Sequence, residues 1–169
     1  MRAARAIVDR ALEAILVVLF AALVADVAWQ VATRFVLRRP SPYTEELARF
    51  LLVWLGLLGA SYGFGRRLHL AIELWEARPA WRRWSRRAAT ATTFVFALLV
   101  LGAGGGRLVA LQAELGQRSA AIGIPIGWVY AALPIAGALL AFYAAADWVC
   151  PPAAAAAAPA TSIAARLDS

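Results

Sequence analysis

The residues of this chain that could do chemistry are few and scattered. One acid, Asp26, lies inside a long apolar run, and Glu45 and Glu46 stand together at the start of another. The sequence has one histidine, His69, and one cysteine, Cys150. These counts exclude a multi-haem cytochrome with paired axial histidines and a thiol oxidoreductase with cysteine pairs. The sequence also has no HExxH or P-loop pattern, and we predict no cofactor.

Asp26 is the acid with the most chemical interest, because a carboxylate in hydrocarbon is costly unless it is paired or in contact with water. One interpretation makes it an ion or proton ligand. The interpretation that we favour is a structural pair with Arg49, Arg107 or a threonine hydroxyl.

The composition places these residues in a membrane protein. Of the 169 residues 63% are apolar, and the mean hydropathy is +0.69. A span needs about 20 apolar residues, and four windows qualify: 14–33, 47–65, 88–106 and 122–146. We predict an all-α fold with a four-helix transmembrane domain over residues 1–150. Residues 151–169, rich in Ala and Pro, are expected to form a disordered cytoplasmic tail.

The arginines indicate topology. All 17 basic residues are Arg, and most lie between the apolar runs, so a pI near 11.0 does not indicate nucleic-acid binding. Eleven fall in the N-terminal segment, the second connection and the tail, and six fall on the other side. The positive-inside rule then places both termini in the cytoplasm. Asp9 and Glu13 are unusual in a signal peptide, so we expect an uncleaved first helix.

The second span has distinctive ends. Pro40 and Pro42 should stop the first helix, and Thr44 is the expected N-cap of the second. Glu45 and Glu46 then fall in the first turn, at the positive end of the helix dipole. Capping already explains most of the presence of these two acids.

The interior of the second span has two different faces. On a helical wheel, Glu45, Arg49, Gly56 and Gly63 lie along one line, with Gly59 beside it. Trp54 points to the opposite side. Since lipid requires only one apolar face, we predict that one face packs within this chain and the other against a second protein, and that these residues serve subunit packing. The alternative is that Trp54 faces lipid.

The second connection combines aromatic and basic residues. A short amphipathic helix lying in the headgroup layer, in contact with membrane lipids, is predicted from Trp75, Trp81, Trp84, Arg82, Arg83, Arg86 and Arg87. In the last span, Trp128 marks an interface, and Pro134 predicts a kink.

Two groups of residues resemble a known family. The first group is Arg34-Phe35-Val36, Pro42, Glu45-Glu46-Leu47-Ala48-Arg49, Trp54, Gly59 and His69. The second is Ile124-Pro125-Ile126-Gly127-Trp128-Val129-Tyr130, followed by Leu133-Pro134. In order and spacing both resemble the small membrane subunit of tripartite ATP-independent periplasmic (TRAP) transporters, the DctQ-like proteins, over about residues 26–143. The acid at Asp26 and the Ala/Pro tail depart from the pattern.

The resemblance implies a non-enzymatic scaffold in the bacterial inner membrane. It implies a DctM-like large permease subunit carrying the substrate and sodium sites, and a DctP-like periplasmic binding protein delivering an organic acid such as a dicarboxylate. It also implies that Arg34 pairs with Glu45 or Glu46 at the periplasmic face and that Trp54 packs at depth. The alternatives are a stand-alone four-helix transporter that uses Asp26, and a membrane enzyme that uses Asp26 and Asp147, although the predicted topology puts those two acids near opposite sides.

Overall fold

The computed structural model describes residues 2–36, 38, 41–66 and 79–149. The helices are α1 (Arg2–Phe35), α2 (Pro42–Gly65), α3 (Pro79–Phe96), the π-helical η2 (Ala97–Gly104), α4 (Gly105–Glu114), α5 (Gly127–Tyr130) and α6 (Ala132–Val149). Among the described residues, four helical stretches are long and apolar enough to cross a membrane: Ala3–Phe35, Pro42–Gly65, Arg87–Glu114 and Gly127–Trp148. The predicted all-α fold with four membrane-spanning helices is confirmed.

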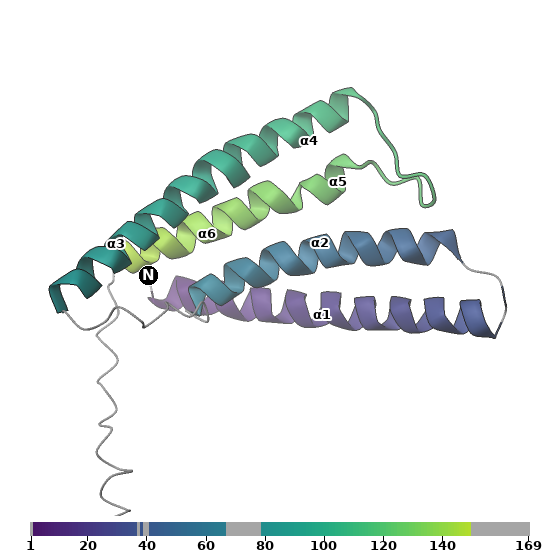
Figure 1. The fold of residues 1–169 in the computed structure, drawn as a ribbon, viewed down its shortest axis with the longest axis horizontal. Coiled ribbons are helices and arrows are strands. Elements are labelled where there is room, and N and C mark those ends of the chain that lie inside the picture. The colour runs from purple at the N-terminus through teal and green to yellow at the C-terminus, as the bar shows by residue number, and fades with distance from the viewer. Residues whose placement is uncertain (1, 37, 39–40, 67–78, 150–169) are drawn as a thin grey trace, which may run out of the picture.

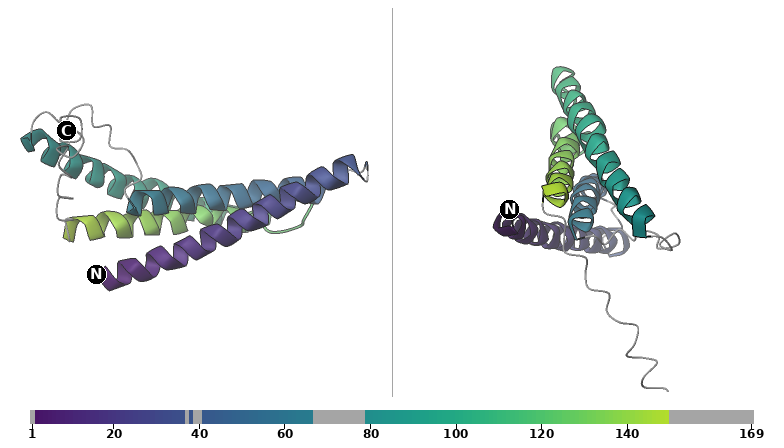
Figure 2. Two further views of the ribbon diagram at one scale, coloured as in Figure 1. Left: turned by 90° about the horizontal axis from the view of Figure 1, so that it is seen from below. Right: turned by 90° about the vertical axis from the view of Figure 1, so that its left-hand side faces the viewer.

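The helices form two antiparallel hairpins that meet at α2 and α6 (Figure 1). α1 packs along α2, α2 packs against α6, and α6 packs against the continuous rod of α3, η2 and α4. The N-terminus and the C-terminal end of α6 lie at the same end of the bundle (Figures 1 and 2). In the most apolar part of the span Gly127–Trp148, 33% of the residues are buried, whereas in that of Ala3–Phe35 only 6% are. The last span is therefore the centre of the fold, and α1 is its most open edge.

Glycine lets α6 approach the rod closely. A Cβ on Gly137 would lie 2.8 Å from the carbonyl oxygen of Ala97 and 2.8 Å from Cβ of Leu101. Both distances are far below van der Waals contact, so any side chain here would push the two helices apart. In membranes, where helices gain little from hydrophobic burial against one another, such backbone approach is a main source of helix association.

The start of α2 differs from the prediction. The N-cap is Ser41, in an extended backbone conformation, and Pro42 occupies the first helical turn. Thr44 lies inside the helix and donates its hydroxyl to the Ser41 carbonyl at 2.9 Å. The prediction of Thr44 as N-cap was wrong because proline suits the first helical position, where its missing N–H would have no intrahelical partner.

The last span begins later than predicted, at Gly127 in place of Ile122. Residues 115–126 instead form a tight loop with an isolated antiparallel bridge between Arg118 and Pro125. A short break at Ala131 separates α5 from α6, and the predicted kink at Pro134 stays a prediction. Pro134 lies in the first turn of α6 and has no N–H to donate to the carbonyl of Tyr130.

The predicted interfacial helix stays a prediction. The structure describes residues 79–87 as the first turns of α3, in line with the third span, and Trp84 and Arg87 are exposed there. His69 and Trp75 lie outside the described residues, as does the tail over residues 151–169. The side chains of Trp81, Arg82, Arg83 and Arg86 also lie outside the described part of the structure.

Candidate functional site

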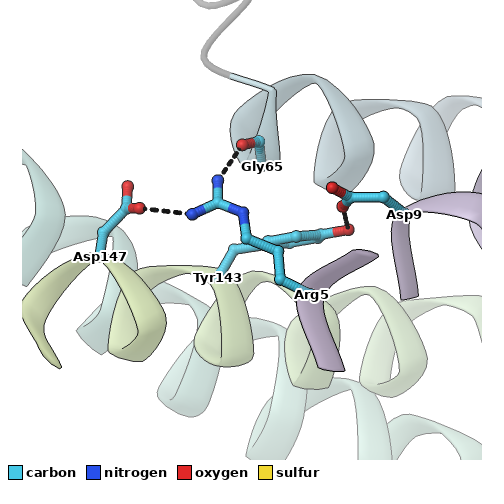
Figure 3. Close-up of polar contacts among 5 residues, drawn as sticks. All are labelled: Arg5, Asp9, Gly65, Tyr143 and Asp147. Carbon is cyan, nitrogen blue, oxygen red and sulfur yellow. Dashed lines mark hydrogen bonds and ion pairs between the residues drawn. The ribbon is translucent and has the colours of Figure 1, made fainter. Parts of the chain in front are cut away.

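A polar network closes the end of the bundle that carries the N-terminus (Figure 3). One guanidinium nitrogen of Arg5, on α1, donates to Oδ1 of Asp147, on α6, at 3.0 Å. The other donates to the carbonyl oxygen of Gly65, the last residue of α2. The hydroxyl of Tyr143 donates to Oδ1 of Asp9 at 2.6 Å. Three helices are thus joined by side chains that are far apart in the sequence.

Tyr143 is the centre of this network. Its ring is fully buried, and the Arg5 guanidinium lies 5.6 Å from the ring centroid, within cation–π range. A Cβ on Gly65 would lie 2.6 Å from Cε1 of Tyr143, so the ring fits only because α2 ends in glycine there. Arg5 with Asp9, and Tyr143 with Asp147, are spaced four residues apart, which places each pair on one helix face.

The opposite end is closed by a single carboxylate. Oε2 of Glu46, on α2, accepts hydrogen bonds from the backbone N–H groups of Ala121 at 2.9 Å and Ile122 at 3.1 Å. The loop is held in shape by its own bonds: Ser119 N–H donates to the Ile124 carbonyl, and the Ile122 N–H also approaches Oγ of Ser119 at 3.2 Å. Glu46 therefore fastens the loop of the second hairpin to the first hairpin.

The two acids of the second span have separate partners. Glu45 pairs with Arg49 at 3.3 Å, with both side chains largely exposed, at 68% and 71%. Arg34 is exposed and forms no ion pair with either acid among the described residues. The expected tie from Arg34 to Glu45 or Glu46 is absent there because Glu46 turns to the loop and Glu45 to its own helix.

Asp26 does not have the predicted partners. It is 9% exposed, and its Oδ2 has no hydrogen-bond partner among the described residues. Arg49 pairs with Glu45, and Arg107 makes no ion pair within the described ranges. The expectation of a structural pair with either arginine was wrong. No cluster of three or more potential metal-ligating residues occurs in the described part of the chain.

The two faces of α2 have different surroundings. Trp54 packs against the cluster of Leu12, Leu58 and Tyr143 inside this chain. Gly56 is exposed, with no atom within 4 Å of the place a Cβ would take. Gly59 lies near Leu16, and Gly63 is buried, so the glycine line runs from the surface into the chain.

An apolar cavity of about 780 Å³ opens between α1, α2 and the second hairpin. Trp54, Leu12 and Ile15 line one side, and Trp128 and Ile124 line the other. Its apolar lining suits hydrocarbon and offers no group for catalysis or for holding an ion.

The predicted residues are not brought together into one site. Glu46 and Pro125 lie at the loop end, Trp54 is partly buried against the core cluster, and Gly56 lies on the surface. Sequence reasoning missed the network of Arg5, Asp9, Tyr143 and Asp147. One sequence pattern could have indicated this network. Charged or hydroxyl side chains are spaced four residues apart at the start of the first span and at the end of the last span, which the predicted topology places on the same side of the membrane.

Two comparisons with known proteins bear on this geometry. The family model described as "Tripartite ATP-independent periplasmic transporters, DctQ component" matches residues 23–151. The chain is also 30% identical over 143 residues to the sialic acid TRAP transporter small permease protein SiaQ of Vibrio cholerae serotype O1 (strain ATCC 39315 / El Tor Inaba N16961). That alignment covers 82% of this chain and 79% of the relative.

Proposed function

Because the chain belongs to the DctQ family of TRAP transporter components, we propose that it is a scaffold that holds a large permease subunit in the membrane. The family consists of transporter subunits and not of enzymes, and this chain is a small, multi-pass permease component of a TRAP transporter.

The observation that carries the proposal is the division of α2 into an inner and an outer face. Trp54 packs against residues of its own chain. On the other face, Gly56, Leu52 and the Glu45–Arg49 pair are exposed. An exposed glycine in a membrane span lets another backbone come close. We propose that the large permease subunit packs against this outer face.

The solute and ion sites belong, in this proposal, to the large subunit. The cavity of this chain is apolar, and no metal-ligating cluster occurs among the described residues. The relative's name specifies sialic acid, which is a carboxylate. We propose sodium-coupled uptake of an organic acid delivered by a periplasmic binding protein. We place the complex in the bacterial inner membrane with both termini cytoplasmic, which agrees with the position of the N-terminus and the C-terminal end of α6 at the same end of the bundle and with the arginine distribution.

Cysteine crosslinking in the assembled complex tests the scaffold interface. In a Cys150→Ser background, Gly56→Cys is expected to crosslink to the co-expressed large permease subunit in membranes. The matched control is Val17→Cys, which is 63% exposed on α1. Equal crosslinking from both positions, or crosslinking from Val17→Cys alone, would contradict the proposed face.

Reconstitution separates the scaffold from a stand-alone transporter. Liposomes that contain this chain alone are expected to show no uptake when a sodium gradient and the purified binding protein with its solute are supplied. Adding the large subunit should give uptake. Solute uptake by this chain alone, abolished by Asp26→Asn, would replace the scaffold with a transporter.

A further inference from the structure

Arg107, on α4, is a cation in a membrane span that has no ion-pair partner among the described residues. It lies within the apolar stretch Arg87–Glu114 and is exposed. It forms no ion pair with any described residue. An arginine in a transmembrane segment is costly unless it is paired or reaches water, so a group beyond the described residues is expected to satisfy it.

The neighbouring helix gives the depth of Arg107. A Cβ on Gly127 would lie 3.7 Å from the carbonyl oxygen of Val109 and 3.9 Å from Cβ of Gln112, so Gly127 is level with this turn of α4. Trp128, which is exposed beside Gly127, is of the type that marks the membrane interface. Arg107 precedes this turn by two to five residues, or about 3–7.5 Å of helix, toward the membrane centre.

The direction of the helix disfavours a lipid phosphate as the partner. The nearer membrane surface lies toward the C-terminal end of α4, where the helix ends at Glu114. In an α-helix the Cα–Cβ bond tilts toward the N-terminus, which here points back into the bilayer. The guanidinium would have to fold back along its own helix to reach a headgroup.

The surface around Arg107 fits another helix. Gly104 and Ala110 stand one turn before and after it, and both are exposed, as are Val100 and Leu111. Small residues on both sides of the arginine allow close approach by a partner backbone. The π-helical η2 ends at Gly104, one turn before Arg107, and such turns are frequent at functional sites.

We propose that this face of α4, around Arg107, docks a transmembrane helix of the large permease subunit that carries an Asp or Glu opposite the guanidinium. Charge complementarity is the reason for this choice, because a carboxylate between two packed helices neutralises Arg107 where lipid tails cannot. The inference rests on the proposed scaffold function for the existence of the partner. It adds a second contact surface, separate from Gly56 on α2, and names the chemistry of its partner.

Charge substitution at Arg107 tests the proposal. The tagged large subunit is purified in mild detergent from membranes that also contain this chain, and the retained fraction of this chain is measured. Arg107→Gln is expected to weaken retention about tenfold or more, while Arg107→Lys should keep much of it. Arg118→Gln is the matched control, since Arg118 lies in the loop after α4 and contacts the Gly123 carbonyl. Its retention should equal that of the wild type.

Folding is checked on the chain alone. Because Arg107 forms no ion pair within the described part of the chain, Arg107→Gln should leave the thermal unfolding of the isolated subunit unchanged. A loss of stability in the isolated subunit would assign Arg107 to the internal structure and overturn the proposal.

Crosslinking from Ala110→Cys, in the Cys150→Ser background, identifies the occupant. A crosslink to a helix of the large subunit, with an acid whose change to Gln reproduces the Arg107→Gln effect, is the expected result. A crosslink to a second copy of this chain would replace the proposal with a homodimer. Full retention of Arg107→Gln without any protein crosslink would assign the arginine to lipid. If wild-type chain and large subunit do not co-purify, the scaffold function itself fails.

Discussion

The two ends of the bundle are closed in different ways. At the end with the N-terminus, side chains of α1 and α6 and a carbonyl of α2 contact one another through Arg5, Tyr143 and Asp147 (Figure 3). At the other end, the carboxylate of Glu46, on α2, accepts hydrogen bonds from two backbone N–H groups of the loop over residues 115–126. The first closure needs several particular side chains, whereas the second needs one side chain and a loop of fixed shape.

This difference indicates which end can open. The loop over residues 115–126 is joined to α2 through Glu46, whereas the other end is joined by the contacts of Arg5 with Asp147 and of Tyr143 with Asp9. Separating the two hairpins at the loop end breaks a contact with Glu46, while separating them at the other end exposes a buried aromatic ring and two acids. We therefore expect any motion between the hairpins to pivot at the Tyr143 end.

The largest expected effect is at Tyr143. Tyr143→Ala removes a fully buried ring and leaves Asp9 without its hydroxyl partner, so the free energy of unfolding should fall by about 3–5 kcal/mol. Tyr143→Phe keeps the ring and should cost about 1 kcal/mol. The measurement is reversible unfolding of the purified chain in mixed micelles, followed by tryptophan fluorescence.

Trp148→Ala serves as the control for this loss, because Trp148 is a large side chain on the same helix that is 64% exposed. It should change stability little. If Tyr143→Ala and Trp148→Ala were equally mild, the network would not be the closed end of the bundle.

An intermediate effect is expected for the ion pair between Arg5 and Asp147. The two side chains are 27% and 14% exposed, so water screens the pair only in part. A double-mutant cycle with Arg5→Gln and Asp147→Asn should give a coupling free energy of about 1–2 kcal/mol in the unfolding measurement. The same cycle on Glu45 and Arg49, which lie on the surface of one helix, should give a coupling near zero. Equal couplings would remove the distinction between a closure and a surface pair.

The helices and the pair of Glu45 and Arg49 could be predicted from the sequence because both depend on local spacing. Apolar runs of about 20 residues determine membrane helices, and a separation of four residues determines the pair. The same logic placed Trp54 and Gly56 on opposite faces, and the structure then indicated which face is inside.

The closures depend on long-range geometry, which local spacing does not contain. Arg5 and Asp147 are 142 positions apart, and each taken alone indicates only a polar helix end. Glu46 binds backbone N–H groups, which every residue but proline has, so no side-chain pattern marks its partner. Asp26 was expected to be paired because a charged side chain in an apolar span needs a partner. The position of an acid in an apolar run does not, however, identify that partner.

The smallest expected effect on global stability, and the most local one, is at Glu46. Glu46→Ala removes the acceptor of the Ala121 and Ile122 N–H groups, while the helices keep their own hydrogen bonds. The loop over residues 115–126 should open more often, and trypsin should cut after Arg118 several-fold faster, because cleavage follows the population of the open form. Appearance of the fragment ending at Arg118 is followed by mass spectrometry.

Glu45→Ala is the matched control, one residue away and bonded only to Arg49 among the described residues. It should leave cleavage after Arg118 at the wild-type rate. Tyr143→Phe should also leave it unchanged, because the two closures lie at opposite ends of the bundle. Faster cleavage in Tyr143→Phe would show that the ends are coupled through the helices, and the bundle would then open as a unit and not from the loop end.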